Sequence, residues 1–556
     1  MKIILWRRFV VRSLAFLGLG SAFLSLQGEV ALPTVFGDHM VLQREMAAPV
    51  WGTGTAGETI TVQFAGQTKN STVNSEGTWQ VRLDPLVASA EPRELSVSSP
   101  GATLKIQDVL VGDVWLASGQ SNMAYPLRAL SKAADYLAQA NDPLLRFFTV
   151  VKNTSAEPLT DLKGRWDVST SESAKDFSAV AFFYAQEIRR SQNIPVAILH
   201  SSWGGTPIQT WIGLTGYKSD PPLTKPLEQW EKAMEQYQKV KADPKLLTNY
   251  QEELKKWKLE VEPAYNELLK AYNADLAAGK TQGPRPQPSL PEPANPDPIA
   301  PYGPSKRPTT PTVIFNAMIA PLTPYGLKGI LWYQGETNGS SGLEYRELLP
   351  RLIQNWRGLW NQGELPFLIV QLPGCYKDET PVAKTGWPYL REAQFMALKL
   401  PKTGLAVTID IGNPQDVHPD NKEFVGKRLA LIGRKVAYDE SIVYTGPIYQ
   451  DSVIEGNQVK IRFREIGGGL TPGQAPWCAK GVEPMPTEKL IGFYIAGEDK
   501  RWVEAEAKVE GGMVIVSSPQ VAKPVAVRYA WANSPRANLY NKEGLPAAPF
   551  RTDDWP

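Results

Sequence analysis

Histidine and cysteine are scarce in this chain. Its 556 residues include three histidines, His39, His200 and His418, and two cysteines, Cys375 and Cys478. Because histidine is the commonest general base near neutral pH, a base-dependent site has few possible positions. No pair of His or Cys residues has the spacing of metal ligands, so the sequence predicts no metal and no other cofactor. It leaves open whether the two cysteines form a disulfide.

An excess of either charge is also lacking. Lys and Arg number 59 against 57 Asp and Glu, which gives a formal net charge of +2. The chain has no basic block and no stripe of aromatic residues interleaved with arginine, and nucleic-acid sites need such features. The composition therefore excludes nucleic acid as a partner.

Long apolar runs are missing after the first 28 residues. Before that point Lys2, Arg7, Arg8 and Arg12 accompany an apolar run over residues 13–26, which is too short to span a bilayer comfortably. We expect residues 1–28 to be a signal peptide for export to the periplasm or the cell exterior, with no stable membrane insertion after its removal. Retention as an N-terminal anchor is the alternative. The sequence does not indicate an oligomeric state.

The chain is too long for one hydrophobic core, and its periodicity changes twice. Residues 29–107 alternate apolar and polar side chains between Gly-rich turns, as in residues 59–64, and this predicts an N-terminal β-sandwich domain. Alternation resumes in residues 459–463 and 513–516, which predicts a β-rich C-terminal domain over 442–556.

Residues 108–441 alternate between strand-like and helix-like runs. We expect strands over 109–117, 196–201, 330–333, 367–372 and 405–409, and helices over 179–190, 345–357, 389–398 and 423–436. This order predicts a three-layer α/β/α domain with a parallel sheet.

An insertion over 215–311 interrupts that domain. Apolar side chains at spacings of three and four between residues 227 and 261 predict a helical hairpin, and a proline-rich connector follows from residue 283. We expect the insertion to form a separate lobe that does not contribute to the active site.

The most informative segment is the end of the run at 109–117. It leads into the motif ASGQSNM over residues 117–123, which centres a polar turn on Ser121. In α/β enzymes the carboxyl ends of the strands form the ligand crevice, where backbone N–H groups can stabilise an oxyanion. Ser121 is therefore a candidate nucleophile, and a tight turn in which it only caps the next helix is the alternative.

His418 is the candidate general base. It lies in a polar loop after the predicted strand 405–409, with Asp416 two residues before it. His39 lies in the N-terminal β region, where a surface or packing role is expected. His200 ends an apolar run, which is typical of a buried histidine at a strand end. Ser121, His418 and Asp416 thus fit the roles of nucleophile, base and orienting carboxylate.

These residues carry a family resemblance. Besides ASGQSNM, the chain has SWGGT over 202–206, GILWYQGETN over 329–338, DVHP over 416–419, and a tail with VRYAW over 527–531 and NLYNKEG over 538–544. Together these blocks resemble the sialate O-acetylesterase family of SGNH-type hydrolases. The resemblance covers nearly all of the chain except the insertion, and it implies an SGNH-like fold and removal of O-acetyl groups from carbohydrates through an acetyl-enzyme.

The resemblance also implies roles for individual residues. The backbone N–H groups of Ser121 and Gly205 would form the oxyanion hole with the side chain of Gln334, or with Asn338 as the alternative. The wider superfamily has its acid three residues before the histidine, where this chain has Gln415, so Asp410 is an alternative to Asp416. Residues beside the blocks are expected to line the substrate pocket: Gln120, Asn122, Trp203, Glu336 and Asn338.

Other functions fit parts of the sequence. A glycosidase would use paired carboxylates such as Glu336 and Asp410. A non-catalytic carbohydrate-binding protein would use the β domains and some of the 17 tryptophans. A lipase or thioesterase would share the triad but need a long apolar groove. The ordered blocks favour the esterase, whose natural substrate, sialic acid or another acetylated polysaccharide or oligosaccharide, the sequence leaves open.

Overall fold

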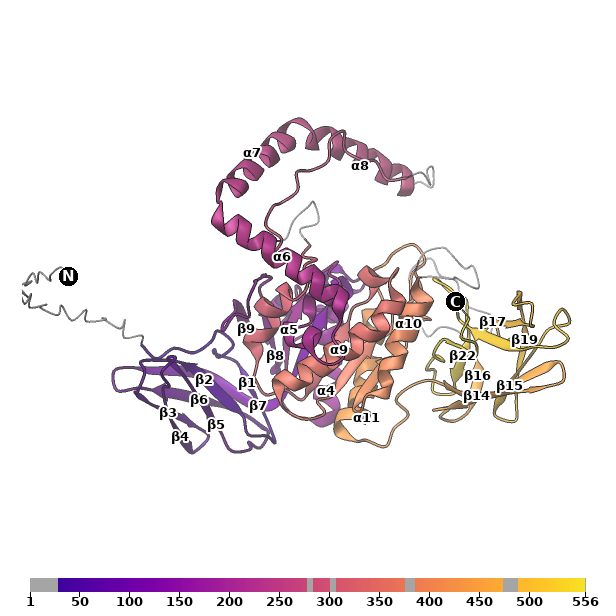
Figure 1. The fold of residues 1–556 in the computed structure, drawn as a ribbon. Coiled ribbons are helices and arrows are strands. Elements are labelled where there is room, and N and C mark those ends of the chain that lie inside the picture. The colour runs from indigo at the N-terminus through magenta and orange to yellow at the C-terminus, as the bar shows by residue number, and fades with distance from the viewer. Residues whose placement is uncertain (1–28, 278–283, 301–306, 376–385, 474–488, 556) are drawn as a thin grey trace, which may run out of the picture.

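The computed structural model describes residues 29–277, 284–300, 307–375, 386–473 and 489–555. The predicted signal peptide and Cys478 lie outside these ranges, while Cys375 is buried. Figure 1 shows N-terminal β strands, a central α/β region with a helical arm above it, and a C-terminal β region.

A mainly parallel sheet forms the centre of the molecule. Its order is β13-β12-β11-β7-β10-β8-β9, and the β8/β9 pair is antiparallel. Ile198 of one strand and Gly329 of another both pair with Trp115. The strands are β7 (Thr103–Gly119), β8 (Asp142–Val150), β9 (Gly164–Ser169), β10 (Val196–Ser202), β11 (Gly329–Tyr333), β12 (Phe367–Val370) and β13 (Thr403–Ala406). The sequence predicted five of these and missed the edge pair β8 and β9.

Helices cover both faces of this sheet. On one side α4 (Ala179–Gln192) packs on α11 (Lys422–Tyr438), and on the other α9 (Gly342–Trp360) packs on α10 (Trp387–Met396). Trp115 of β7 meets Tyr184 of α4 edge to face, and Trp332 of β11 meets Trp356 of α9 in the same way. The predicted three-layer α/β/α fold is confirmed. Short helices complete it: α1 (Ser121–Ala124), α2 (Ala133–Ala138), α3 (Ser171–Ala174) and α5 (Leu214–Lys218).

The N-terminal strands are joined to the central sheet through β7. The first half of β7 pairs with β1 and β6, and its second half pairs with β10 and β11. The domain boundary expected at 107/108 therefore falls inside one strand, and the two parts share a continuous hydrophobic core. The strands here are β1 (Val41–Gln43), β2 (Pro49–Thr53), β3 (Thr59–Phe64), β4 (Gln67–Thr72), β5 (Thr78–Arg82) and β6 (Ser89–Ser98), of which β2 and β5 form a second sheet.

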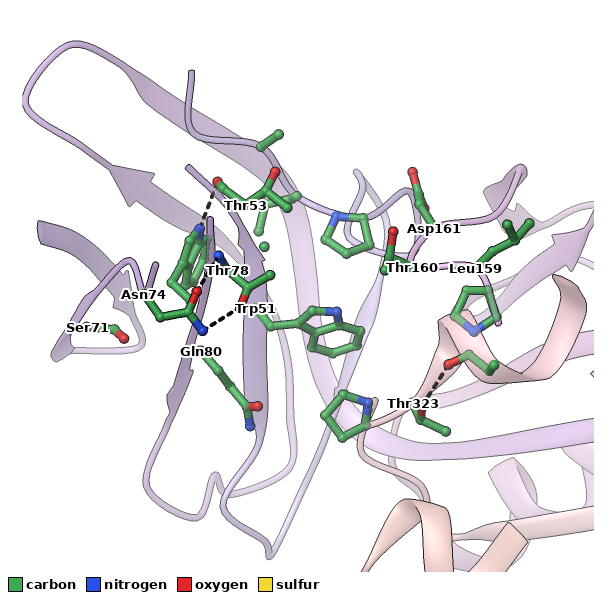
Figure 2. Close-up of a pocket in the computed structure, with 18 of the residues that line it drawn as sticks. Trp51, Thr53, Ser71, Asn74, Thr78, Gln80, Leu159, Thr160, Asp161 and Thr323 are labelled. Carbon is green, nitrogen blue, oxygen red and sulfur yellow. Dashed lines mark hydrogen bonds between the residues drawn. The ribbon is translucent and has the colours of Figure 1, made fainter. Parts of the chain in front are cut away.

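A cavity of about 720 Å³ lies where the N-terminal strands meet the α/β domain. Figure 2 shows Trp51 of β2 projecting between the two parts. Asp161 in its wall already accepts hydrogen bonds from the backbone and the hydroxyl of Thr34, at 2.8 and 3.0 Å. The lining residues include none of the predicted site residues, so this cavity is separate from the candidate active site.

The C-terminal region is β-rich, as expected. Its strands are β14 (Ile448–Glu455), β15 (Gln458–Arg464), β16 (Leu470–Pro472), β17 (Phe493–Ala496), β18 (Trp502–Glu504), β19 (Glu506–Glu510), β20 (Met513–Ser517), β21 (Ala526–Tyr529), β22 (Leu539–Asn541) and β23 (Phe550–Arg551). A second hydrophobic core joins them to Val407 and Ile409, which follow β13. Arg391 of α10 also donates to the carbonyls of Ala532 and Asn533 at 2.7 Å, which ties the two regions together.

The predicted helical hairpin in the insertion is wrong. The helices α6 (Thr224–Ala242), α7 (Lys245–Glu260) and α8 (Glu262–Ala277) follow one another as an open arch (Figure 1). The proline-rich connector packs against them instead: Trp257 donates to the carbonyl of Leu290 at 2.8 Å, and Gln236 to that of Pro296 at 3.2 Å. The apolar stripe thus has a partner other than a second helix, because an extended proline-rich chain can cover it.

The contact between α4 and α11 depends on a glycine, which gives a test of the fold. A Cβ on Gly426 would lie 2.6 Å from Phe183 Cβ and 2.8 Å from the carbonyl of Val180. Gly426→Ala should lower the free energy of unfolding by about 1–3 kcal/mol, because the helices must separate. A Cβ on Gly358 of α9 would meet no atom within 4 Å. Gly358→Ala should therefore be neutral or stabilising by up to about 1 kcal/mol. Thermal unfolding of both variants measures this, and equal midpoints would contradict the packing.

Candidate active site

A backbone contact at Gly119 fixes the turn that carries Ser121. Gly119 has a φ of +139°, and a Cβ there would lie 2.1 Å from the carbonyl oxygen of Tyr333, so the position requires glycine. The N–H of Gln120 donates to that carbonyl at 3.0 Å, and the N–H of Trp203 donates to the carbonyl of Gly119 at 3.0 Å. These contacts place Ser121, the first residue of α1, at the carboxyl edge of the sheet between β10 and β11.

Ser121 and His418 are brought together across the sheet edge. The Oγ of Ser121 lies 2.8 Å from Nε2 of His418, which is a hydrogen-bond distance. His418 belongs to the loop between β13 and α11, and its side chain is about one-third exposed (35%). The pair has the geometry that a serine nucleophile and its general base need.

Asp416 is the carboxylate beside His418, but it does not bind the imidazole directly. Its Oδ1 accepts the backbone N–H of His418 at 2.8 Å and lies 3.7 Å from Nδ1, too far for a hydrogen bond. The alternative, Asp410, is bound by both terminal nitrogens of Arg428 at 2.6 and 2.7 Å and is 1% exposed. Asp410 therefore belongs to a buried ion pair, and its proposed role as orienter is wrong.

The other two histidines occupy different settings. Nδ1 of His39 lies 2.6 Å from Asp108 in the N-terminal region. His200 is buried at the end of β10 with Nε2 2.6 Å from the hydroxyl of Ser202, and burial lowers its pKa to about 4. Both placements agree with the sequence-based assignment of His418 as the candidate base.

The second block runs directly past Ser121. A Cβ on Gly204 would lie 3.2 Å from Cβ of Ser121, and Gly205 has a left-handed φ of +72°. Within the described part of the chain, the backbone N–H groups of Ser121 and Gly205 have no hydrogen-bond acceptor. Trp203 is partly exposed, with the ammonium of Lys152 6.0 Å from its ring centroid.

Gln334 does not fit its predicted role in the oxyanion hole. Its side chain is fully buried, and Nε2 donates to the carbonyl of Thr206 at 3.2 Å and to Oδ1 of Asn338 at 2.8 Å. A primary amide has two N–H groups, so both are used. Asn338, the alternative, is 4% exposed, accepts from the N–H of Ile208 at 3.0 Å and donates to Gln209 at 3.0 Å. Both side chains hold the blocks together.

Gln120, Asn122 and Glu336 were also expected to line the pocket, but each binds partners inside the protein. Gln120 accepts from the N–H groups of Gly335 and Thr337 at 3.3 and 3.2 Å. Asn122 is completely buried and donates to Glu336. With Glu336 bound there and Asp410 bound to Arg428, neither carboxylate of the alternative glycosidase pair is open to substrate.

Two basic residues at the site escaped the sequence analysis. A Cβ on Gly205 would lie 2.4 Å from Nε of Arg307, so this side chain from the end of the insertion packs against the glycine. The insertion therefore does contribute to the site, contrary to expectation, and no local pattern marks Arg307. Lys422 lies at the start of α11, and its Nζ donates to Oδ1 of Asn122 and to the carbonyl of Pro419, both at 2.6 Å. Its spacing of four from His418 is the only sequence signal.

The pKa values at the site follow from burial and from these charges. Burial lowers the pKa of His418, the cations of Lys422 and Arg307 lower it further, and Asp416 opposes them. Burial lowers the pKa of Lys422 to about 7, against the opposing effect of Glu336. Burial raises the pKa of Glu336. The imidazole is thus kept neutral to lower pH than an ordinary histidine, as a general base requires.

Among the described residues there is no group of three or more His, Cys, Asp or Glu side chains that could hold a metal ion. The same part of the chain contains no helix that is both long and apolar enough to cross a membrane.

Comparison with known proteins places the chain in a family. Residues 311–432 match the family model described as a carbohydrate esterase, sialic acid-specific acetylesterase. The chain is 30% identical to the sialate O-acetylesterase of Rattus norvegicus over 92% of each chain, and 29% identical to that of Homo sapiens over 92% of this chain and 90% of the human one.

Among solved structures, a carbohydrate acetylesterase from Xanthomonas citri is similar with a TM-score of 0.73 and 34% identity, covering 95% of this chain and all of the other. The agreement extends over both β-rich regions as well as the α/β domain. The chain belongs to the sialate O-acetylesterase family.

Proposed function

We propose that this protein removes O-acetyl groups from carbohydrates through an acetyl-enzyme formed on Ser121. The observation that carries the proposal is the 2.8 Å contact between Oγ of Ser121 and Nε2 of His418 at the carboxyl edge of a parallel sheet. Membership of the esterase family supports the reaction, because acetyl transfer needs a nucleophile and a base in this arrangement.

In the first half of the reaction His418 takes the proton of Ser121 as Oγ attacks the acetyl carbon. The N–H groups of Ser121 and Gly205 stabilise the oxyanion that develops on the carbonyl oxygen. The bond between the acetyl carbon and the sugar oxygen then breaks, and the sugar oxygen takes the proton from His418. A water molecule, deprotonated by His418, then attacks the acetyl carbon of the acetyl-enzyme. The bond from that carbon to Oγ breaks, acetate leaves, and Oγ takes the proton back from His418.

Asp416 acts on His418 mainly through its charge. At 3.7 Å from Nδ1 it stabilises the imidazolium that forms during each half-reaction, and its bond to the backbone N–H of His418 holds the loop. Because Asp416 is exposed, water weakens this effect.

We also propose that the sugar carries a negative charge. Two exposed cations flank the second block, Lys152 near the ring of Trp203 and Arg307 against Gly205. A guanidinium beside the nucleophile suits a carboxylate on the substrate, since it can bind both oxygens. The names of the curated relatives favour sialic acid, an acidic sugar, over a neutral acetylated polysaccharide. From the composition of residues 1–28 we also propose that the protein is exported.

The nucleophile and base can be tested by removing each. Ser121→Ala and His418→Ala should each lower kcat/KM for 4-nitrophenyl acetate by about 10⁴-fold or more, because the two residues act as a unit. His39→Ala, which removes a histidine far from the site in sequence and fold, is the control and should keep the wild-type rate. An organophosphonate should label Ser121. Labelling of another serine, or an active Ser121→Ala protein, would refute the mechanism.

Substitution of Asp416 should affect catalysis, whereas substitution of Asp410 should affect stability. In the wild type, kcat/KM should rise with pH through an ionisation below the usual histidine pKa of about 6.5, since only neutral His418 is a base. Asp416 raises that pKa, so Asp416→Asn should lower kcat and move the rise to still lower pH. Asp410→Asn should instead destabilise the fold by about 3–5 kcal/mol by breaking the buried pair with Arg428. A displaced pH profile in folded Asp410→Asn protein would contradict this division.

The substrate charge can be tested at Arg307. Arg307→Gln should raise KM for an O-acetylated sialic acid at least about tenfold, the value of one charge-assisted hydrogen bond, and leave KM for 4-nitrophenyl acetate nearly unchanged. Arg285→Gln, in the same proline-rich connector, is the matched control. Equal effects on acidic and neutral acetyl esters would contradict the proposed preference.

A further inference from the structure

The backbone carbonyl of the residue on each side of His418 is held by a side chain from outside its loop. The carbonyl of Val417 accepts a hydrogen bond from Nδ2 of Asn122 at 2.9 Å. The carbonyl of Pro419 accepts one from Nζ of Lys422 at 2.6 Å. Because the two carbonyls flank the residue, these bonds fix both the position and the direction of the backbone that carries the imidazole.

Asn122 links this clamp to the nucleophile. It directly follows Ser121 in α1, so any movement of the His418 loop relative to Ser121 has to break the bond to Val417. The same amide accepts from Lys422 through Oδ1 at 2.6 Å and donates to Glu336 through Nδ2. One side chain thus joins three loops at the carboxyl edge of the sheet.

Asn122, Lys422 and Glu336 form a cluster in which one positive and one negative charge balance. Asn122 and Lys422 are both fully buried, and the ammonium of Lys422 and the carboxylate of Glu336 bind the same amide from opposite ends. Asp416 and Asp420 also favour the charged form of Lys422, and its Nζ lies 4.8 Å from the ring centroid of Tyr125. Buried opposite charges that an amide bridges in this way add little stability, but they can favour one arrangement of the loops.

An arrangement of this kind is needed here because the usual orienting bond is missing. In a Ser-His-Asp site the carboxylate binds Nδ1 and fixes the imidazole, whereas Asp416 lies 3.7 Å from Nδ1. We propose that Asn122 and Lys422 are positioning residues that hold His418 at hydrogen-bonding distance from Ser121, with Glu336 as their counter-charge. This inference rests on the proposed roles of Ser121 and His418.

Positioning and simple structural support predict different kinetics. A loosened His418 loop slows proton transfer and leaves binding of a small ester unchanged, so kcat falls while KM does not. Lys422 also contributes positive charge at His418, together with Arg307 and against Asp416. Removing the ammonium should therefore raise the pKa of His418 and move the rise of kcat/KM to higher pH.

The test compares Asn122→Ala and Lys422→Met with a control on the same helix, Lys427→Met. Lys427 pairs with Glu423 near the protein surface, 43% exposed, and does not touch the site. Asn122→Ala should lower kcat for 4-nitrophenyl acetate about 10–100-fold with KM within about threefold, and slow phosphonate labelling of Ser121 in parallel. Lys422→Met should also move the pH profile upward. Lys427→Met should match the wild type.

Glu336→Gln is a second, more conservative variant, which keeps the test valid if Asn122→Ala or Lys422→Met fails to fold. It keeps the acceptor for Asn122 and nearly the same volume, and it should move the pH profile in the same direction as Lys422→Met, because loss of the counter-charge favours neutral Lys422. Folded variants with wild-type kcat and pH profile would overturn the inference. That result is distinct from failure of the mechanism, in which Ser121→Ala would remain active.

Discussion

Hydrogen bonding along both edges of β7 is the constraint on which this structure depends. Its first half belongs to the N-terminal sheet through β1 and β6, and its second half is the centre of the parallel sheet between β10 and β11. It ends at Gly119, where the chain passes so close to Tyr333 that only glycine fits. A shift of β7 would therefore disturb the N-terminal core, the central sheet and the position of Ser121 together.

Beyond that turn, the site consists of loops that are joined to one another by hydrogen bonds from buried polar side chains. Gln120 holds the turn after β11, Gln334 joins that turn to the loop after β10, and Asn122 reaches the loop that carries His418. Gln334 and Asn122 have both ends of their amides bound inside the protein, and Gln120 has its oxygen bound there, as buried polar groups require. Among the described residues, we expect substrate to meet the serine hydroxyl, the imidazole, backbone N–H groups and the exposed cations around Trp203 and Gly205.

The electrostatics of the site follow from the same arrangement. A buried lysine near a histidine disfavours the imidazolium, and the partly exposed Asp416 offsets this only in part. The cost of burying Lys422 is reduced by Glu336 and by the Pro419 carbonyl and the Asn122 amide that bind the ammonium. The pKa of His418 is thereby lowered, and no carboxylate binds the imidazole directly.

The sequence alone was sufficient for features that depend on local pattern. Alternation of strand and helix runs predicted the layers, and the scarcity of histidine together with the ASGQSNM and DVHP motifs identified Ser121 and His418 as a pair. Local pattern did not reveal what each polar side chain binds, since Gln334, Asn122 and Glu336 resemble pocket residues until their partners are seen. Those partners come from loops far apart in the chain, and Arg307 reaches Gly205 only because the connector returns along the helical arm. Which polar groups are used inside the protein and which remain for substrate was decided by tertiary structure, because a hydrogen bond depends on distance in space and not on position in the sequence.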